Sequence, residues 1–547
     1  MMPLRLYPHP CVKIGIAFLA ITITLSSSLL VAAQTSVTTY HNDNYRTGWN
    51  STETTLTPTN VAASSFGILA KVAIDDQVDA VPLVVPGVNI TAGGNRGTHD
   101  VVYIASGNNT VYAIDADSGA VLLTTNLGTP VSSPLGCNNN GPHVGVDSTP
   151  VIDVAANTLY LIAYTHSSTG PTYTLHALDL GNLTDKLTPT VVTASHTLSN
   201  GTTFAFNATY QRQRPGLLLA NGNIYAGFGS FCDLSANVSR GWLLGWNAST
   251  LAPLPANQLN DSQATDPDSF FLSSIWMSGY GPAADDSGNI LFVTGNSDYS
   301  GTTYDGVTNI QESVVKVAPS LTDVLDLFTP SNQSSLDQGD TDFGSGGVLV
   351  LPDQSGSTPH LAVAAGKYGV MYFMNEDSLG GYSTSGNNVL GSYTVGGCWC
   401  GESYFVDRDG AARVVSSGGN QVLIWKVKTS PNPALTQVSQ SPSLQTGQSG
   451  GFFTSVSSNA TTNTIVWALT RPLSKTNDGV TLVAFNPDAG KAMKVLFHGS
   501  AGAWPSYPGN LNQVPVVANG KVYVATNKQL RIFGLLNAGS KPQQRKK

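Results

Sequence analysis

The amino-acid sequence predicts an all-β fold, an eight-bladed β-propeller, and three observations support this prediction. Only 11% of the residues are charged, whereas 56 are Gly and 30 are Pro, which disfavours long helices rich in Glu, Lys and Arg. Short runs of Val, Ile, Leu, Tyr and Phe alternate with clusters of Gly, Asn, Asp and Pro, as is typical of strands and turns. These runs group into eight similar units, and such a repeat indicates a propeller.

Each unit follows the same order of short strands. It opens with a run that carries Pro or Gly, continues with a strand that follows a tight turn, and closes with a strand that ends in Asp or Asn. The clearest turn copies are Asn221–Tyr225 and Asn519–Tyr523, where an Asn-Gly pair between apolar runs predicts a hairpin. The eight units begin at Ala80, Ser148, Arg214, Gly281, Gly346, Ser403, Phe453 and Val514.

The last unit, which begins at Val514, supplies only three strands before the chain ends. One further strand, Phe66–Ile74, precedes the first unit and has no place in it. We expect this N-terminal strand to complete the last blade, because closure of the ring removes open sheet edges that invite aggregation. A seven-bladed ring with one elaborated insertion is the alternative.

The two ends of the chain differ in composition from the repeats. Arg5 and Lys13 precede the apolar run Ile14–Leu30, and small residues at 31–33 predict cleavage of a secretory signal before Gln34. An uncleaved membrane anchor is the alternative, and no later stretch is long and apolar enough to span a bilayer. We therefore expect a secreted protein, extracellular or periplasmic. Its parts are a signal peptide at 1–33, one propeller domain at 34–536 and a disordered basic tail at 537–547.

Four cysteines remain once the signal is removed, and an even number in an exported chain indicates disulfides. We favour the pairs Cys137–Cys232 and Cys398–Cys400, the second enclosing only Trp399, although each of the latter two could pair with a distant partner. A four-cysteine metal site is disfavoured, because it would need paired C-x-x-C motifs. No metal site is expected from the cysteines or from the scattered histidines.

Polar residues collect just before the innermost strand of several units. Because the innermost strands of a propeller line its central channel, these residues are expected to surround one channel mouth. There they could bind a small polar ligand, a glycan or a protein. The competing interpretation is that they hold loops through hydrogen bonds and face channel water. The candidates are Asp79, His143, Asp147, Gln213, Arg214, Trp276, Asp342, Glu402 and Gln513.

One repeat motif carries a family resemblance. The stretch Ala113–Gly119, followed by Leu123, resembles the repeat A-x-D-x-x-[TS]-G-x-x-x-W of quinoprotein (PQQ-dependent) alcohol dehydrogenase-like propellers, and Ala484–Gly490 is a partial copy. In that family the final Trp docks against the next blade, a place that Leu123 takes here. Tyr45–Asn50 and Gly344–Val348 are in addition similar to stretches of secreted PQQ-like repeat proteins.

The resemblance implies a set of site residues that this sequence matches only in part. The family's dehydrogenases bind the quinone on a Trp floor, hold Ca²⁺ through Glu and Asn, and use an Asp base. Many also have two adjacent cysteines beside the cofactor, to which Cys398-Trp399-Cys400 next to Glu402 is the nearest match. No stretch matches the Ca²⁺ or base motifs. The resemblance therefore allows PQQ with Ca²⁺ as a cofactor without requiring it.

Charge excludes one class of partner. The net charge of −8 and the lack of an interior basic cluster argue against nucleic-acid binding. We expect a monomer that does not insert into membranes after signal cleavage. The main functional expectation is a binding or interaction module of unknown ligand. The alternatives are a PQQ-dependent oxidoreductase of the alcohol or sugar dehydrogenase type and a glycan-binding surface adhesin.

Overall fold

The computed structural model describes residues 34–536 except 140, 266–270, 298–303 and 449, together with Met1 and Pro3. The expected signal at 1–33 and the expected tail at 537–547 therefore lie outside the described residues. The described residues from Thr35 onward form a compact unit that is built almost entirely of strands. Within the described part of the chain, no helix has the length and apolar character needed to cross a membrane.

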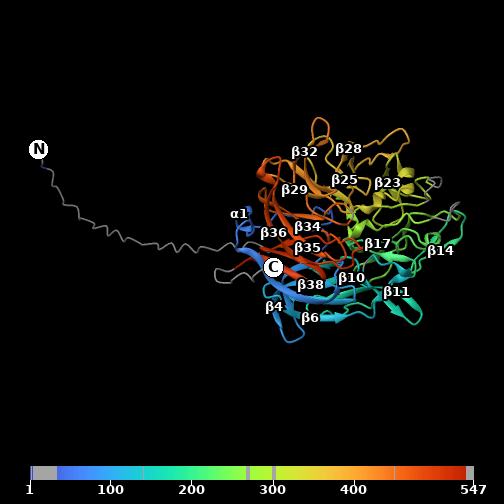
Figure 1. Cartoon of the computed structure of the whole chain (residues 1–547), viewed down its shortest axis with the longest axis horizontal. Coiled ribbons are helices and arrows are strands. Elements are labelled where there is room, and N and C mark those ends of the chain that lie inside the picture. The colour runs from blue at the N-terminus through green and yellow to red at the C-terminus, as the bar shows by residue number, and fades with distance from the viewer. Residues whose placement is uncertain are drawn as a thin grey trace. The chain divides into compact units, whose positions relative to one another are not determined.

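Antiparallel sheets follow one another in chain order around a ring, so the colours in Figure 1 run around the ring from blue to red. Blade 1 consists of β3 (Leu83–Ile90), β4 (Gly97–Ala105), β5 (Thr110–Asp115) and β6 (Val121–Asn126). Blade 2 consists of β9 (Val151–Asp153), β10 (Thr158–Ser167), β11 (Gly170–Asp179) and β12 (Thr190–Val191). Blade 3 consists of β15 (Gln211–Gln213), β16 (Leu218–Ala220), β17 (Asn223–Ser230), β18 (Trp242–Asn247) and β19 (Gln258–Leu259). Blade 4 consists of β20 (Ala283–Ala284), β21 (Ile290–Val293), β22 (Val314–Val317) and β23 (Val324–Thr329), with β27 (Gly381–Tyr382) at its edge.

The second half of the ring repeats this plan. Blade 5 consists of β24 (Val348–Leu351), β25 (Leu361–Ala365), β26 (Val370–Asn375) and β28 (Gly391–Thr394). Blade 6 consists of β29 (Ser403–Val406), β30 (Ala412–Gly418), β31 (Gln421–Lys428) and β32 (Ala434–Gln440). Blade 7 consists of β33 (Thr454–Asn459), β34 (Thr462–Thr470), β35 (Gly479–Asn486) and β36 (Lys494–Ala503), with β1 (Trp49–Asn50) at its inner edge. Blade 8 consists of β37 (Val516–Ala518), β38 (Lys521–Leu535) and β2 (Phe66–Gln77).

Short elements occupy the connections between and within the blades. Two small hairpins are β7 (Val131–Ser132) with β8 (His143–Val144), and β13 (Ser195–Thr197) with β14 (Thr203–Ala205). The α-helices are α1 (Pro58–Val61) and α2 (Gln333–Gln338). The 3₁₀ turns are η1 (Pro134–Gly136), η2 (Ala236–Val238), η3 (Met277–Gly279), η4 (Phe343–Ser345) and η5 (Pro487–Ala489).

The ring closes through the N-terminal strand. β2 pairs antiparallel with β38, from Phe66 opposite Leu535 to Ala73 opposite Gln529. β38 turns back on itself at Lys528, whose φ is +57°. The turn is evident from the closeness of its two halves, since a Cβ added to Gly534 would lie 3.1 Å from the Gly520 carbonyl oxygen. A straight strand would separate those two residues by about 45 Å. Blade 8 therefore has four strands, and the predicted eight-bladed, N-terminally closed propeller is confirmed.

Apolar side chains fill the space between neighbouring blades. β5 and β25 are buried along nearly their whole length, so both faces of these strands are covered. Leu123, which stands where the family repeat has Trp, packs in one apolar cluster with Ile152 and Leu161 of blade 2. A smaller side chain thus keeps the contact between blades 1 and 2. Burial on both faces also explains the low content of charged residues.

The segment Thr35–Glu53 follows the inner side of the ring and touches the inner strand of every blade. Its hydrogen bonds reach Val84, Ile152, Leu219, Ala284, Val350, Tyr404, Val456 and Val517, one residue from each of the eight blades in turn. At its centre the fully buried Arg46 donates to the carbonyls of Tyr40, Leu217 and Pro282. The resemblance noted at Tyr45–Asn50 therefore falls on a segment that fastens the blades together, a role that the sequence did not predict.

Both disulfides pair as expected. Cys137–Cys232 connects the loop before blade 2 to the loop after β17 of blade 3. Cys398–Cys400 closes a small ring just before β29 of blade 6.

Candidate functional site

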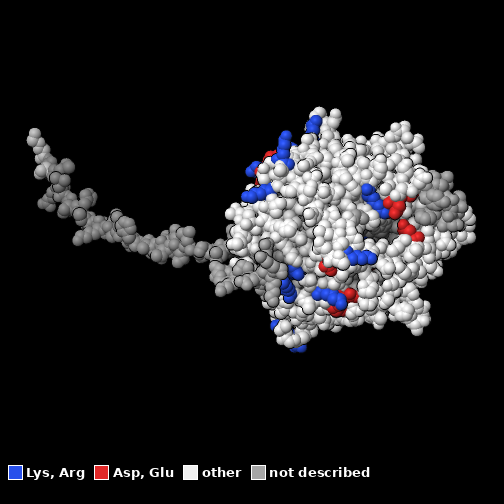
Figure 2. Space-filling view, in the orientation of Figure 1, with Lys and Arg blue, Asp and Glu red and all other residues white. Residues whose placement is uncertain are grey.

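A cavity of about 270 Å³ opens on the ring face where the inner strands begin. Its volume is close to the lower end of the range of about 300–1,000 Å³ that is usual for small-molecule sites. Figure 2 shows a hollow with cationic and acidic side chains around it, and further charged side chains near the rim of the same face. The cavity, called the mouth pocket below, is lined by Asn139, Arg212, Arg214, Ser230, Cys232, Asp233, Trp276, Asp340, Asp342, Lys367, Trp399, Pro508, Gly509, Asn510 and Asn512.

Two tryptophans form an aromatic corner of the mouth pocket. The rings of Trp276 and Trp399 lie edge to face, with centroids 5.5 Å apart. The ammonium nitrogen of Lys367 lies 5.4 Å from the Trp276 ring centroid and 4.6 Å from that of Trp399. At these distances the cation is attracted by the face of each ring. The corner therefore holds a positive charge against two flat apolar surfaces.

Trp399 is held by its neighbours in the chain and by one arginine. Cys398 and Cys400 are fully buried and bonded to each other, so the Trp side chain between them projects from a closed ring of residues. The backbone of Trp399 accepts a hydrogen bond from Arg471 and donates one to Gly450. The cystine that lines the pocket is the other one, through Cys232, whereas the sequence pointed to Cys398 and Cys400.

The acidic side of the pocket is organised around Lys367, whose Nζ lies 2.9 Å from Asp340 and 2.8 Å from Asp342. Asp340 is exposed, whereas Asp342 is 2% exposed. Burial raises the pKa of Asp342 to about 6, against the effect of Lys367. The second carboxylate oxygen of Asp342, Oδ1, has no hydrogen-bond partner. A buried acceptor of this kind is costly unless a water or a ligand satisfies it.

Two further acidic residues lie close to Asp342. Burial raises the pKa of Asp233. The charge of Lys367 and a hydrogen bond from the Asn296 side chain lower this pKa in part. Glu312 is fully buried, accepts a hydrogen bond from the Phe343 backbone, and has its pKa raised by burial and by the charge of Asp342. The pocket thus contains carboxylates and a lysine that partly neutralises them, with the Asn296 amide and Glu312 next to its acidic side.

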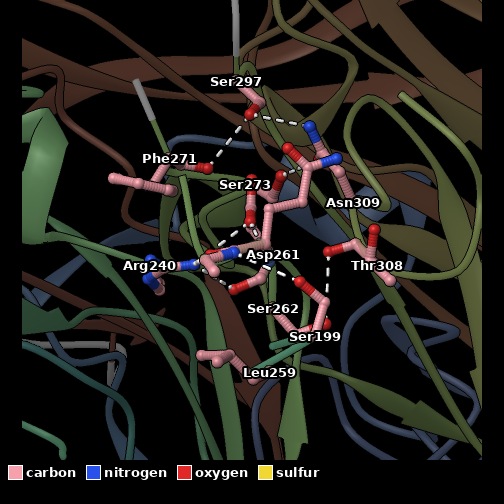
Figure 3. A network of polar contacts seen from close by, with 12 residues as sticks. Ser199, Arg240, Leu259, Asp261, Ser262, Phe271, Ser273, Ser297, Thr308 and Asn309 are labelled. Atoms are coloured by element: carbon pink, nitrogen blue, oxygen red, sulfur yellow. Dashed lines mark hydrogen bonds and ion pairs between the residues drawn. The ribbon is translucent and has the colours of Figure 1, made fainter. Parts of the chain in front are cut away.

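A buried polar network, drawn in Figure 3, joins residues that are close in sequence to Trp276 and Asn296. Arg240 donates to Asp261 and lies between the rings of Phe204 and Phe271, 4.6 and 3.8 Å from their centroids. The neighbouring side chains continue the network from Ser273 through Asn309 to Ser297. Because Ser273 and Ser297 are close in sequence to Trp276 and Asn296, the network sets the position of this wall of the pocket.

The opposite wall is cationic. Arg212 pairs with the buried Asp147 at 3.0 Å, and Arg214 lies close enough to Asp79 and Asp147 for their charges to raise its pKa. Burial together with Arg212 nevertheless lowers the pKa of Arg214 to about 10. Burial and the charge of Asp147 raise the pKa of Asp79 to about 7. Asp79 and Asp147 do not line the pocket, so the aspartates stand behind the arginines.

The candidates predicted from sequence divide into three groups. Arg214, Trp276 and Asp342 line the mouth pocket, and Asp79 and Asp147 stand directly behind it. The remaining four, namely His143, Gln213, Glu402 and Gln513, do not line it.

Each of those four has a different environment. His143 hydrogen-bonds Asp76 at 2.7 Å, and Gln213 donates to the carbonyl of Pro215. Gln513 donates to backbone carbonyls at 78–80, so both glutamines hold backbone in place. Glu402 is fully buried with neither carboxylate oxygen hydrogen-bonded, and burial raises its pKa to about 8.

Several pocket residues were not among the candidates. Lys367 lies in the turn between β25 and β26, Asp233 follows β17, and Arg212 lies two residues before the candidate Arg214. Strand direction alternates in an antiparallel blade, so the turn after the second strand is on the same face as the start of the first. A search of those turns, as well as of the residues before each inner strand, would have found Lys367 and Asp233.

Comparison with known proteins identifies the fold. No protein-family profile and no curated protein sequence matches the chain. Among solved structures, a europium-containing methanol dehydrogenase superposes with a TM-score of 0.60 at 11% identity, covering 91% of this chain and 98% of its own. The quinohaemoprotein alcohol dehydrogenase ADHIIG from Pseudomonas putida HK5 gives a TM-score of 0.60 at 12% identity, covering 94% of this chain and 82% of its own. The chain therefore shares the eight-bladed propeller fold of these two enzymes.

Proposed function

We propose that the chain is an oxidoreductase that binds a planar, polyanionic quinone of the PQQ type in the mouth pocket. The observation that carries this proposal is the meeting of Trp276, Lys367 and the buried carboxyl of Asp342 in one cavity at the channel mouth. The fold likeness to two alcohol-oxidising enzymes supports the same conclusion, although fold alone does not determine function.

The pocket's side chains fit such a cofactor chemically. PQQ is flat and carries three carboxylates. Trp276 offers an aromatic face, and Arg212, Arg214 and Lys367 offer positive charge. Arg212 Nε and Asp342 Oδ1 are buried without hydrogen-bond partners, so each leaves a polar atom for a ligand or water to satisfy.

The same pocket has oxygen donors suited to Ca²⁺, which prefers carboxylate and amide oxygens. Asp233 lines the pocket and supplies carboxylate oxygens, and the amide of Asn296, whose side chain gives a hydrogen bond to Asp233, lies beside it. Among the described residues, no group of three or more His, Cys, Asp or Glu side chains is placed to hold a metal. A Ca²⁺ ion here would accordingly be held by this mixed acid–amide set together with donors from outside the chain.

Asp342 is the proposed general base. When bound, PQQ supplies a two-electron oxidant for an alcohol or sugar hydroxyl. Asp342 accepts the hydroxyl proton, for which a carboxyl with a pKa of about 6 is largely ionised at neutral pH. Lys367, 2.8 Å away, favours that ionised form. Trp276 and Trp399 keep water from one side of the site.

The binding module expected first from the sequence has weaker support. It would account for a pocket at the channel mouth, but it gives no role to a buried carboxyl held ionised by a lysine. No observation specifically favours the adhesin alternative. Two disulfides suit an oxidising compartment, and we propose an extracellular or periplasmic location.

The proposal is tested by titrating the chain with PQQ in the presence and absence of Ca²⁺, followed by quinone absorbance and tryptophan fluorescence. Dye reduction with primary alcohols and aldoses then tests turnover. Lys367→Ala should weaken PQQ binding and reduce turnover, whereas the exposed Lys426→Ala, which removes a surface ion pair with Asp409, should leave both unchanged. Absence of an absorbance or fluorescence change at saturating PQQ with Ca²⁺ would reject the proposal.

A further inference from the structure

Two arginines form the cationic wall of the mouth pocket, and two aspartates lie next to them. The four residues are Arg212, Arg214, Asp79 and Asp147. Arg212 and Asp147 form a direct ion pair at 3.0 Å, with side chains 6% and 1% exposed. The two arginines line the cavity, whereas the two aspartates do not. The wall therefore presents positive charge to a ligand and keeps its compensating negative charge on the protein side.

Asp79 is surrounded by charges from blades 2 and 3 and by neutral donors from blade 8. Asp147 raises the pKa of its carboxyl, while Arg214 and Arg212 lower it. The Gln77 side chain donates to its Oδ2 at 2.9 Å, and Gln513 donates to its backbone carbonyl at 2.8 Å. A further cation, Arg471, lies near Arg214, and its pKa is lowered by burial and by the charge of Arg214.

The net charge of this wall changes by one with the protonation of Asp79. With both aspartates ionised, the two arginines are fully compensated. A proton on Asp79 leaves one positive charge in excess on the side that faces the cavity. Arg212 Nε and Asp147 Oδ1, both buried, have no hydrogen-bond partner, so the wall also has a donor and an acceptor that its own residues leave unsatisfied.

We propose that Arg212 and Arg214 form an anion subsite of the mouth pocket, and that Asp79 takes up a proton when a carboxylate group of the ligand binds there. The proposal rests on the mouth pocket being the ligand site of the proposed function, and it adds a proton-linked anion subsite. The physical reason is reciprocal. An anion beside the arginines weakens their hold on the Asp79 carboxylate, and a neutral Asp79 strengthens their hold on the anion.

Burial sets the pH range in which this coupling operates. The pKa of Asp79 is raised to about 7, so its charge changes near neutral pH. Ligand affinity should be highest below that value and fall above it, by at most about tenfold per pH unit for one coupled proton.

The test measures PQQ affinity by fluorescence quenching from about pH 5.5 to about pH 8.5 in wild type, Asp79→Asn and His143→Asn. Wild type should lose affinity as the pH rises through about 7, with uptake of up to one proton per ligand by calorimetry in buffers of different ionisation enthalpy. Asp79→Asn, whose amide cannot ionise, should lose that dependence and keep the affinity of the acid form. His143 is a titratable residue that pairs with Asp76 and serves as the control. The variant His143→Asn should behave as wild type. An unchanged pH dependence in Asp79→Asn would overturn the proposal.

A second probe separates this proposal from the proposed function. Citrate carries carboxylates but no quinone, and we expect it to bind weakly at the same wall with the same dependence on Asp79. Citrate binding that depends on Asp79 without PQQ binding would support the anion subsite and reject the cofactor. PQQ binding with no contribution from Asp79 at any pH would support the cofactor and reject the proton-linked anion subsite. Binding of neither probe would overturn both.

The pH dependence of thermal stability, measured without ligand, tests the raised pKa of Asp79 independently of ligand binding. A carboxyl whose pKa is raised by folding stabilises the native state fully only below its unfolded value of about 3.9, and this contribution is lost as pH rises toward the folded value. The melting temperature of wild type relative to Asp79→Asn should therefore fall between about pH 4 and about pH 7 and stay level above. A constant difference across that range would contradict a raised Asp79 pKa and with it the proton uptake.

Discussion

The ammonium nitrogen of Lys367 lies 2.8 Å from Oδ2 of Asp342, although the two residues are 25 positions apart in the chain. Asp342 precedes β24, the inner strand of blade 5, and Lys367 follows β25, its antiparallel partner. The hairpin thereby returns the chain to the face from which it started. A single blade thus supplies both the proposed base and the cation that keeps it ionised.

Lys367→Met should shift the pH dependence of turnover. Because Lys367 lowers the pKa of Asp342 from the value that burial alone would give, its removal raises that pKa. The acid limb of the kcat/KM profile, which lies near pH 6 in wild type if Asp342 is the base, should move to higher pH. Lys426→Met serves as the control. A profile that keeps its acid limb in Lys367→Met would exclude the coupling.

Trp276→Ala should weaken PQQ binding by about tenfold or more, because each 1.4 kcal/mol of lost contact corresponds to about a factor of ten. Trp425→Phe, which changes a buried ring outside the pocket, should leave the dissociation constant unchanged. Fluorescence of the remaining tryptophans and quinone absorbance report the titration. Equal affinities in the two variants would remove Trp276 from the binding surface.

Arg46→Ala should destabilise the whole ring without touching the mouth pocket. Its guanidinium is fully buried and donates to carbonyls on Tyr40, Leu217 and Pro282, which would be left without donors. The loss should be at least about 3 kcal/mol, since each unsatisfied buried acceptor costs about 1–3 kcal/mol. Chemical denaturation measures it, with the exposed Arg408→Ala as control. A loss no larger than that of the control would mean that the segment at 35–53 does not hold the blades together.

The two disulfides should differ in what their removal costs. Cys137–Cys232 spans 95 residues of sequence, so its loss should destabilise by about 4–5 kcal/mol in the chain-entropy treatment. Cys398–Cys400 closes a ring around a single residue, so Cys398→Ser with Cys400→Ser should cost less stability and more PQQ affinity, because Trp399 is released. Denaturation and PQQ titration of both double variants check this order, and the reverse order would contradict it.

The fold was predictable because short local sequence patterns determine the strands and turns of each blade. Turn pairs such as Asn519-Gly520, together with period-two apolar runs, specify hairpins, and the unplaced strand Phe66–Ile74 specified the closure. β38 was assigned as two strands from sequence, and the backbone turn at Lys528 bears this out. The segment at 35–53 was missed because most of its contacts are one or two hydrogen bonds to strands that are distant in sequence, and these leave no periodic pattern.

The site was only partly predictable, for a geometric reason. Candidates were taken from residues before inner strands, which yielded Arg214, Trp276 and Asp342. Lys367 lies in a turn between a second and a third strand, and its ion-pair partner Asp342 is 25 positions away in the chain. Glu402 was chosen by the same rule as Asp342, yet it is fully buried and does not line the pocket. Which residue before a strand faces the cavity depends on the local turn, and this is set by packing between blades.

The most direct test of the central claim is a PQQ titration, with Ca²⁺ present, of wild type and Lys367→Ala side by side. The proposed quinone site predicts saturable quenching of tryptophan fluorescence with a shift of the quinone absorbance in wild type, and a weakening of both in Lys367→Ala. Quenching that is absent in wild type, or equal in the two proteins, would contradict a quinone site formed by Trp276, Lys367 and Asp342.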